Sequence, residues 1–193
     1  FHPQSLTVRD RVHSGALGDL RAIQSYFSYF NRDAANIRNQ ADIGGGALYD
    51  IGCYPIITAR LLFGCEPVRA IALVERDPEF KTDRLVSALV DFGQGRRLDF
   101  TVSTQSVPYQ RVQVCGTATR IEIQIPFNAP LGGSTRIFTD DGSQLDGGSV
   151  HSETIAACDQ YGLQGDAFSQ VVRGEIALPY GVEDAIANMR VID

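Results

Sequence analysis

Apolar positions along the chain follow two repeats, one of about 3.6 residues and one of two, and these predict helices and strands respectively. The helical repeat predicts four helical regions: 3–14, the apolar segment from Gly46 to Phe63, 152–174, and the segment from Gly181 onward. Gly162 and Gly165 weaken the middle of the third region, which leaves one long helix or two shorter helices open there.

Between the helical regions, apolar and polar residues alternate in short runs that turn signals separate. The strands predicted in this way are 20–30, 68–75, 85–92, 96–103, 109–115, 119–125 and 134–139. Asp140-Asp141-Gly142 after the last run is a hairpin signal. Such short turns favour antiparallel neighbours, because parallel neighbours need longer crossovers. We therefore expect an α+β fold with an open, mostly antiparallel sheet of about six strands and helices on one face.

Two polar residues interrupt the apolar helix that ends at Phe63. Asp50 and Tyr54 are four residues apart, so they lie on one face of the helix. An unpaired polar group is costly to bury, so both side chains need a partner or a role. Either Tyr54 donates a hydrogen bond to Asp50 and the pair is structural, or the two belong to a functional site. Pro55 lacks an N–H, which predicts a kink or a restart of the helix near Ile51.

Three glycines, Gly44, Gly45 and Gly46, precede this helix. Glycine tolerates positive φ and lets the backbone approach a ligand closely, although a tight loop without a ligand needs the same freedom. The polar loop before the glycines contains Asn36 and Arg38. Arg38 either binds a hydroxyl, carboxylate or phosphate held near the glycines or is a solvated loop residue.

Composition narrows the classes of partner. The 193 residues suit one domain, and the net charge of −6 without a basic stripe argues against nucleic acid and anionic membrane surfaces as partners. No apolar run approaches the roughly 20 residues of a membrane span. The four cysteines form no C-x-x-C pair and histidines are few, so we expect no metal site and a reducing, cytoplasmic compartment.

The stretch Gly44-Gly45-Gly46-Ala47-Leu48-Tyr49-Asp50-Ile51-Gly52-Cys53-Tyr54 resembles the G-G-G-x-L-x-D-x-G-x-[HY] signature of Gfo/Idh/MocA oxidoreductases. It is most similar to the branch of glucose–fructose oxidoreductase and dimeric dihydrodiol dehydrogenase. The resemblance implies a C-terminal substrate-binding and oligomerisation domain over 1–193. It also implies an N-terminal Rossmann domain for NAD or NADP, which is absent from this chain, as no G-x-G-x-x-G is present.

The resemblance also implies roles for individual residues. Tyr54 would be the catalytic acid/base and Asp50 its catalytic partner, Arg38 and Asn36 would bind substrate, and Gly44, Gly45 and Gly46 would lie near the cofactor. The free pKa of tyrosine, about 10, is high for a base, so a lysine of the missing domain would have to lower it. The isolated chain is accordingly expected to be inactive.

Under this resemblance the complete protein would transfer hydride to or from a sugar, polyol or cyclic diol, as a homodimer or a higher homo-oligomer through the sheet face. The chain starts at Phe1 without methionine and stops inside a helical pattern, which predicts a piece of a longer protein. A non-catalytic carbohydrate-binding or dimerisation module with the same fold is the alternative. A hydrolase is disfavoured, because Asp50 has no second acid at a suitable spacing and no Ser-His-Asp set is visible.

Overall fold

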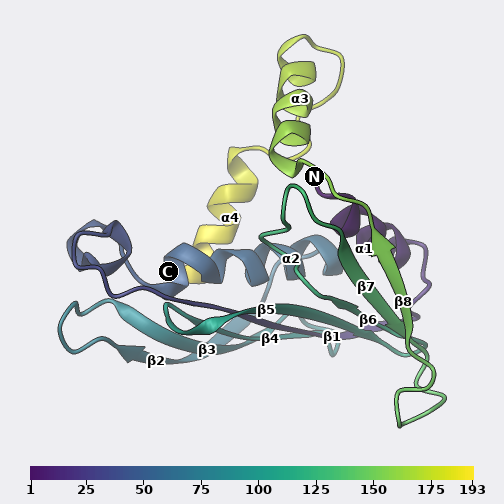
Figure 1. Ribbon diagram of the computed structural model, residues 1–193, viewed down its shortest axis with the longest axis horizontal. Helices are drawn as coiled ribbons and strands as arrows, with labels where there is room; N and C mark the ends of the chain where they lie inside the picture. The colour runs from purple at the N-terminus through teal and green to yellow at the C-terminus, as the bar shows by residue number, and fades with distance from the viewer.

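A single eight-stranded sheet forms the base of the molecule in the computed structural model, which describes residues 1–193 (Figure 1). The strands are β1 (Leu20–Phe30), β2 (Arg69–Arg76), β3 (Asp83–Asp91), β4 (Arg97–Ser103), β5 (Gln105–Gly116), β6 (Arg120–Ile123), β7 (Thr135–Asp140) and β8 (His151–Ile155). Their order across the sheet is β2-β3-β4-β1-β5-β6-β7-β8. The sheet is open, because β2 and β8 are edges that do not pair with each other.

The strand β1 lies inside the sheet and has a neighbour of each kind. It runs parallel to β4, with Ser25 opposite Phe100, and antiparallel to β5, with Ser25 opposite Val112. All other neighbouring strands are antiparallel. The expectation of an open, mostly antiparallel sheet is therefore confirmed.

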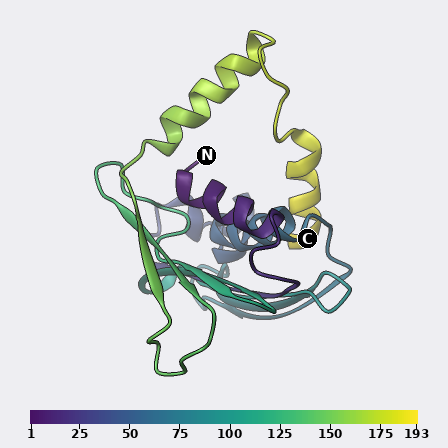
Figure 2. The same ribbon diagram turned by 90° about the vertical axis from the view of Figure 1, so that its right-hand side faces the viewer.

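The helices lie on one face of this sheet (Figures 1 and 2). They are α1 (Pro3–His13), α2 (Cys53–Phe63), α3 (Gln160–Val172) and α4 (Val182–Ile192), with short helical turns η1 (Ile37–Asn39), η2 (Ala41–Ile43) and η3 (Leu48–Gly52). α1 and α2 lie over the sheet, whereas α3 rises away from it and α4 leads back down (Figure 2). None of the helices is long and apolar enough to cross a lipid bilayer.

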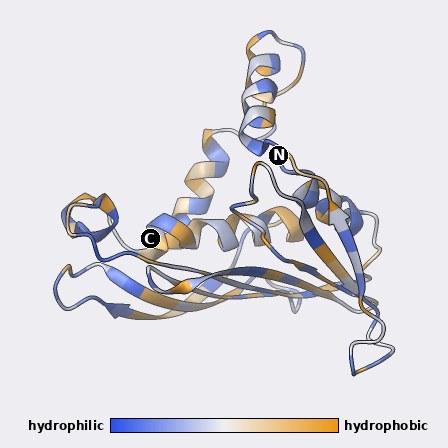
Figure 3. Cartoon of the chain, viewed as in Figure 1, coloured by the Kyte–Doolittle hydropathy of each residue, from blue (hydrophilic) through white to orange (hydrophobic).

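The core lies between the sheet and the helices α1 and α2. Strand residues such as Ile23, Val102 and Val112 are fully buried against Val8 of α1 and Ile56 of α2. Each of these strand positions alternates with a more exposed residue, and Figure 3 shows this alternation in hydropathy along the strands. Burial of this one face is the main stabilising contribution, at about 25 cal/mol per Å² of apolar surface.

Two sequence-based expectations need correction near residue 152. The predicted helix over 152–174 is wrong in its first part, because residues 151–155 form β8 and pair with β7. The sheet therefore has eight strands rather than about six. α3 is one helix that contains both Gly162 and Gly165, and Asp159 caps it by accepting hydrogen bonds from the N–H groups of Tyr161 and Gly162.

The irregularity expected from Pro55 takes a specific form. The turn η3 is a π-helix over Leu48–Gly52 and passes directly into α2. Pro55 has no N–H for the carbonyl of Ile51, so the regular α-helical ladder cannot continue through this position, and the preceding turn is the π-helix. Asp50 lies on this π-helical turn.

Candidate active site

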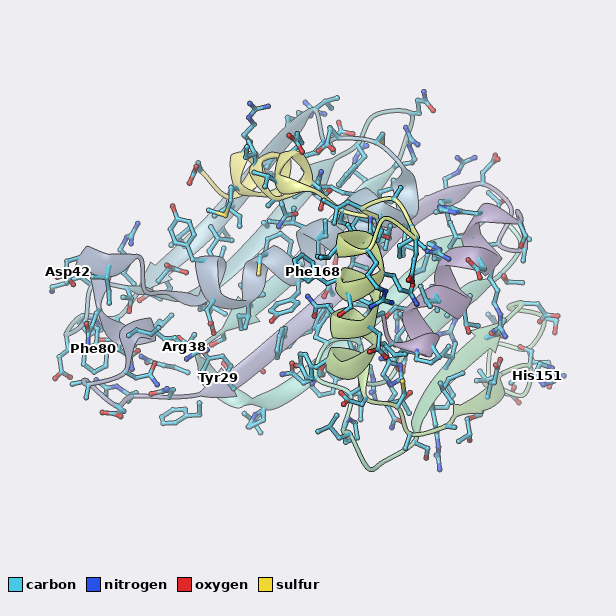
Figure 4. All side chains as sticks on the ribbon, turned by 90° about the horizontal axis from the view of Figure 1, so that it is seen from above. Tyr29, Arg38, Asp42, Phe80, His151 and Phe168 are labelled. Atoms are coloured by element: carbon cyan, nitrogen blue, oxygen red, sulfur yellow. The ribbon has the colours of Figure 1, made fainter.

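Asp50 is the centre of a small polar network that three elements build. Its Oδ2 accepts a hydrogen bond from the Tyr29 hydroxyl of β1 at 2.5 Å, and its Oδ1 accepts one from Nε of Arg38 in η1 at 2.8 Å. The Asp50 side chain is 20% exposed and that of Arg38 is 42% exposed. Figure 4 shows Tyr29 and Arg38 close together, toward the end of the molecule that carries Phe80.

The loop that carries Arg38 is held in place by asparagines. Oδ1 of Asn36 accepts a hydrogen bond from the Arg38 N–H at 3.0 Å and caps η1. Asn39 is buried, and its amide donates to the carbonyl oxygens of Asn31 and Asp33. Asn36 therefore fixes the backbone of Arg38, which is a structural task in addition to the expected contact with substrate.

Tyr54, at the start of α2, lies against an aromatic cluster. The Phe27 and Phe127 rings are stacked with centroids 5.1 Å apart, and the Tyr54 ring lies 5.7 Å from Phe27 and 5.3 Å from Phe127. Burial raises the pKa of the Tyr54 phenol, and the nearby charge of Arg38 partly opposes this rise. Tyr54 makes no hydrogen bond to Asp50, whose oxygens bind Tyr29 and Arg38. The interpretation of a Tyr54–Asp50 hydrogen-bonded pair is therefore wrong for this structure.

A cavity of about 320 Å³ brings three of the predicted site residues together, whereas Asn36 and the three glycines do not line it. Its walls include Asp50, Tyr54 and Arg38 from the sequence-based prediction. The prediction missed the polar residues Tyr29, Asn31 and Asn128 and the apolar residues Phe27 and Ile51. Tyr29 stands in the alternating pattern of strand 20–30, on the face that packs against the helices, and this was the only signal in the sequence that could have found it.

The glycines before the helix are accounted for largely by contacts within the chain. A Cβ on Gly45 would lie 2.7 Å from the carbonyl oxygens of Ile37, Arg38 and Gln40, and a Cβ on Gly46 would lie 1.9 Å from Oδ1 of Asp83. Gly44, at φ 82°, has no atom within 4 Å of its Cβ position. Of the three, Gly44 alone has open space beside it.

The close approach of the Gly46 backbone to Asp83 follows from the role of Asp83 in capping η3. Its buried carboxylate accepts a hydrogen bond from the N–H of Leu48 at 2.7 Å, at the first turn of η3. It thereby supplies the cap that the residues before Leu48 lack. Burial raises the pKa of Asp83, although the hydrogen bond from the Leu48 N–H acts in the opposite direction. No group of three or more His, Cys, Asp or Glu side chains is placed to hold a metal ion.

Comparison with known proteins agrees with the resemblance of the glycine-rich stretch. The chain is 41% identical over 192 residues to an uncharacterized oxidoreductase of Rhizobium meliloti. The alignment covers 100% of the chain and 58% of that protein. It is 29% identical over its whole length to D-xylose 1-dehydrogenase (NADP(+)) 2 of Haloferax volcanii, again over 58% of the relative. The chain thus spans little more than half the length of these relatives.

Solved structures share the fold over the whole chain. The 3-ketoreductase KijD10 from Actinomadura kijaniata, in complex with NADP and TDP-benzene, superposes with a TM-score of 0.88 at 25% identity, over 100% of this chain and 57% of that one. Aldose-aldose oxidoreductase from Caulobacter crescentus superposes with a TM-score of 0.84 at 23% identity, over 100% of this chain and 57% of that one. At this identity the superposition shows only that the fold is shared. The family model for the GFO/IDH/MocA C-terminal domain matches residues 5–122. The chain therefore belongs to the GFO/IDH/MocA family, as a member of its C-terminal domain.

Proposed function

We propose that residues 1–193 are the substrate-binding domain of an NAD(P)-dependent oxidoreductase that acts on a hydroxyl or carbonyl of a sugar, polyol or cyclic diol. An N-terminal dinucleotide-binding domain of the same protein would complete it, and the chain on its own is inactive. The observation that carries the proposal is the Tyr54 phenol, which lines the same cavity as Asp50 and Arg38 and has no hydrogen-bond partner in the chain.

Tyr54 is the proton donor and acceptor in this proposal. Its raised pKa keeps the phenol protonated at neutral pH, which suits donation to a carbonyl oxygen that is being reduced. In the opposite direction the phenolate must take the proton of the substrate hydroxyl. Arg38 is the nearby cation in this chain that lowers the Tyr54 pKa, so a second cation from outside the chain is required for efficient oxidation.

A bound nicotinamide would supply or accept the hydride. The chain offers little of the binding site for it, because Gly45 and Gly46 are occupied by contacts with their own loop and with Asp83. Gly44 has open space at its Cβ position and is the glycine that fits a close approach of the cofactor. The Haloferax enzyme is a D-xylose 1-dehydrogenase (NADP(+)), and KijD10 was solved in complex with NADP, which supports NADP over NAD.

The walls of the cavity suit a compound with several neighbouring oxygen atoms. Arg38 uses only its Nε on Asp50, so both terminal nitrogens are available to oxygens of a ligand. The rings of Phe27 and Tyr54 add an apolar wall beside these polar groups, as is usual in small-molecule sites. Relatives of the chain include a D-xylose dehydrogenase and a 3-reductase of a dTDP-sugar, which supports a sugar as the ligand.

The face of the sheet that bears no helices supports self-association of the complete protein. On it, Ile71 and Leu73 of β2, Leu89 of β3 and Tyr109 of β5 are 43–80% exposed, beside a hollow of about 600 Å³. An apolar sheet face of this kind suits packing against a second copy. The four cysteines are free thiols, which supports a cytoplasmic location.

Replacement of Tyr54 by phenylalanine in the complete protein tests the proposal. With NADP and a panel of aldoses, polyols and diols, we expect kcat to fall by about 100-fold or more, the usual scale for a general acid or base. Tyr180→Phe is the matched control, because Tyr180 is an exposed tyrosine in the loop before α4 and lies outside both the cavity and the open face of the sheet. Near-normal turnover by the Tyr54 variant would remove this residue from the mechanism. Sugar binding by the wild type without turnover would favour a carbohydrate-binding module.

A further inference from the structure

Asp50 is held on both oxygens by side chains from two different elements. Arg38 from η1 engages Oδ1, and Tyr29 from β1 engages Oδ2 through a hydrogen bond of 2.5 Å. A hydrogen bond from a phenol to a carboxylate at this distance is short and charge-assisted, and such bonds are roughly twice as strong as neutral ones. The carboxylate therefore has one orientation, with its plane fixed at two points.

The Tyr29 hydroxyl is suited to this task and not to proton transfer. The ring is partly buried in the row of β1 residues that face the helices. Burial and the hydrogen bond to Asp50 together raise the pKa of Tyr29 well above its usual value, so it remains a donor throughout the neutral range. Packing alone would be satisfied by phenylalanine, so the hydroxyl has a separate use.

That use concerns which of two tyrosines, Tyr29 or Tyr54, donates a hydrogen bond to Asp50. Asp50 and Tyr54 are one helical turn apart, and a carboxylate free to rotate could accept a bond from Tyr54. In the structure Asp50 is turned toward Tyr29 and Arg38 instead, and Tyr54 keeps its hydroxyl free in the cavity.

We propose that Tyr29 is a positioning residue, which holds Asp50 beside Arg38 and away from Tyr54 and so leaves the Tyr54 hydroxyl free for the substrate. This inference rests on the proposed function for the role of Tyr54. It assigns to β1, a strand with no residue in the glycine-rich signature, a part in arranging the site. Tyr29 acts through Asp50 and transfers no proton itself.

A double-mutant cycle in the complete protein tests the inference. Tyr29→Phe alone should lower kcat/KM by about tenfold or more, the scale of a hydrogen bond to a charged group, and most of the loss should be in kcat, since the released Asp50 then competes for the Tyr54 hydroxyl. In an Asp50→Ala background the same change should cost less than about twofold. Tyr180→Phe, in the exposed loop before α4 and outside both the cavity and the open face of the sheet, serves as the control and should change neither parameter by more than about twofold.

Equal losses in both backgrounds would overturn the inference, because Tyr29 would then act on the substrate or on folding directly. No loss in either background would overturn it as well. The same cycle measured on unfolding in urea separates the two proposals: if the wild type turns over no sugar, the proposed function fails. In that case the free energies of unfolding of the two single variants and of the double variant decide whether the Tyr29 hydroxyl holds the Asp50 carboxylate. Additive changes in these free energies would reject the inference.

Discussion

Replacement of Gly46 by alanine should destabilise the start of the apolar helix by displacing a buried carboxylate. The added Cβ would lie 1.9 Å from Oδ1 of Asp83, whose Oδ2 accepts the Leu48 N–H at 2.7 Å. Loss of that cap costs about 1 kcal/mol, and a buried N–H left without a partner costs about 1–3 kcal/mol more. Since Gly46 has φ 130°, strain adds about 1–2 kcal/mol. The total is therefore expected at about 3–6 kcal/mol.

The companion variant Asp83→Ala removes the cap directly and should cost about 2–4 kcal/mol. In its background Gly46→Ala has no carboxylate to displace, so only the backbone strain should remain. The free energy of unfolding is best measured by urea-dependent hydrogen exchange on peptides around Leu48, which reports this segment separately from any other domain. Asp42→Ala, an exposed acid in the same loop, is the control and should change stability by less than about 0.5 kcal/mol.

Additive effects of Gly46→Ala and Asp83→Ala, or an Asp83→Ala protein as stable as the wild type, would refute this reasoning. If Gly46 were instead required for the approach of a cofactor, Gly46→Ala would raise the KM for NADP and leave the exchange of the Leu48 amide unchanged.

The remaining predictions concern acid stability, substrate binding and assembly. The hydrogen bond from Gln105, helped by bonds from backbone N–H groups, lowers the pKa of Asp77 from 3.8 to about 2, so the stability that Asp77 contributes is complete above 3.8 and is lost as the pH falls toward 2. Asp77→Asn should flatten the fall of Tm with pH in that window, and an unchanged slope would contradict this. Arg38→Lys keeps the charge but not the planar fork, and should raise the KM for substrate by about tenfold with a smaller change in kcat; an unchanged KM would place the substrate elsewhere. Leu73→Arg on the open face should lower the mass measured by sedimentation if copies pair there, and an unchanged mass would exclude that face.

The sequence predicted those helices and strands whose signals lie within a short stretch of neighbouring residues. Alternation and turn signals located seven of the eight strands. The alternation in 20–30 and 96–103 reflects the burial of one face of β1 and β4, whereas β2 is exposed along its whole length. β8 escaped because it is a short edge strand, with four exposed residues and a spacing that also fits the start of a helix. Pro55 correctly marked an irregular turn, since its missing N–H acts on the residues just before it.

Partners from distant segments could not be predicted in this way. The spacing of Asp50 and Tyr54 suggested a pair, yet the partner of Asp50 is Tyr29 on a strand, 21 positions earlier in the sequence. Likewise the cap of the glycine-rich turn is Asp83, which arrives from β3. Both contacts depend on how strands and helices are stacked, and short-range periodicity carries no information on that arrangement.

The place of β1 inside the sheet has a consequence for synthesis of the protein. Both of its neighbours, β4 and β5, lie at 97–116, so an emerging chain carries β1 with two unpaired edges until that part has left the ribosome. Contacts this far apart slow folding, and unpaired edges can pair with other chains. β1 includes four aromatic residues, Tyr26, Phe27, Tyr29 and Phe30, which would stabilise such intermolecular contacts and favour aggregation. A chain truncated before residue 97 should therefore aggregate on expression, and the complete protein should depend on chaperones for its yield.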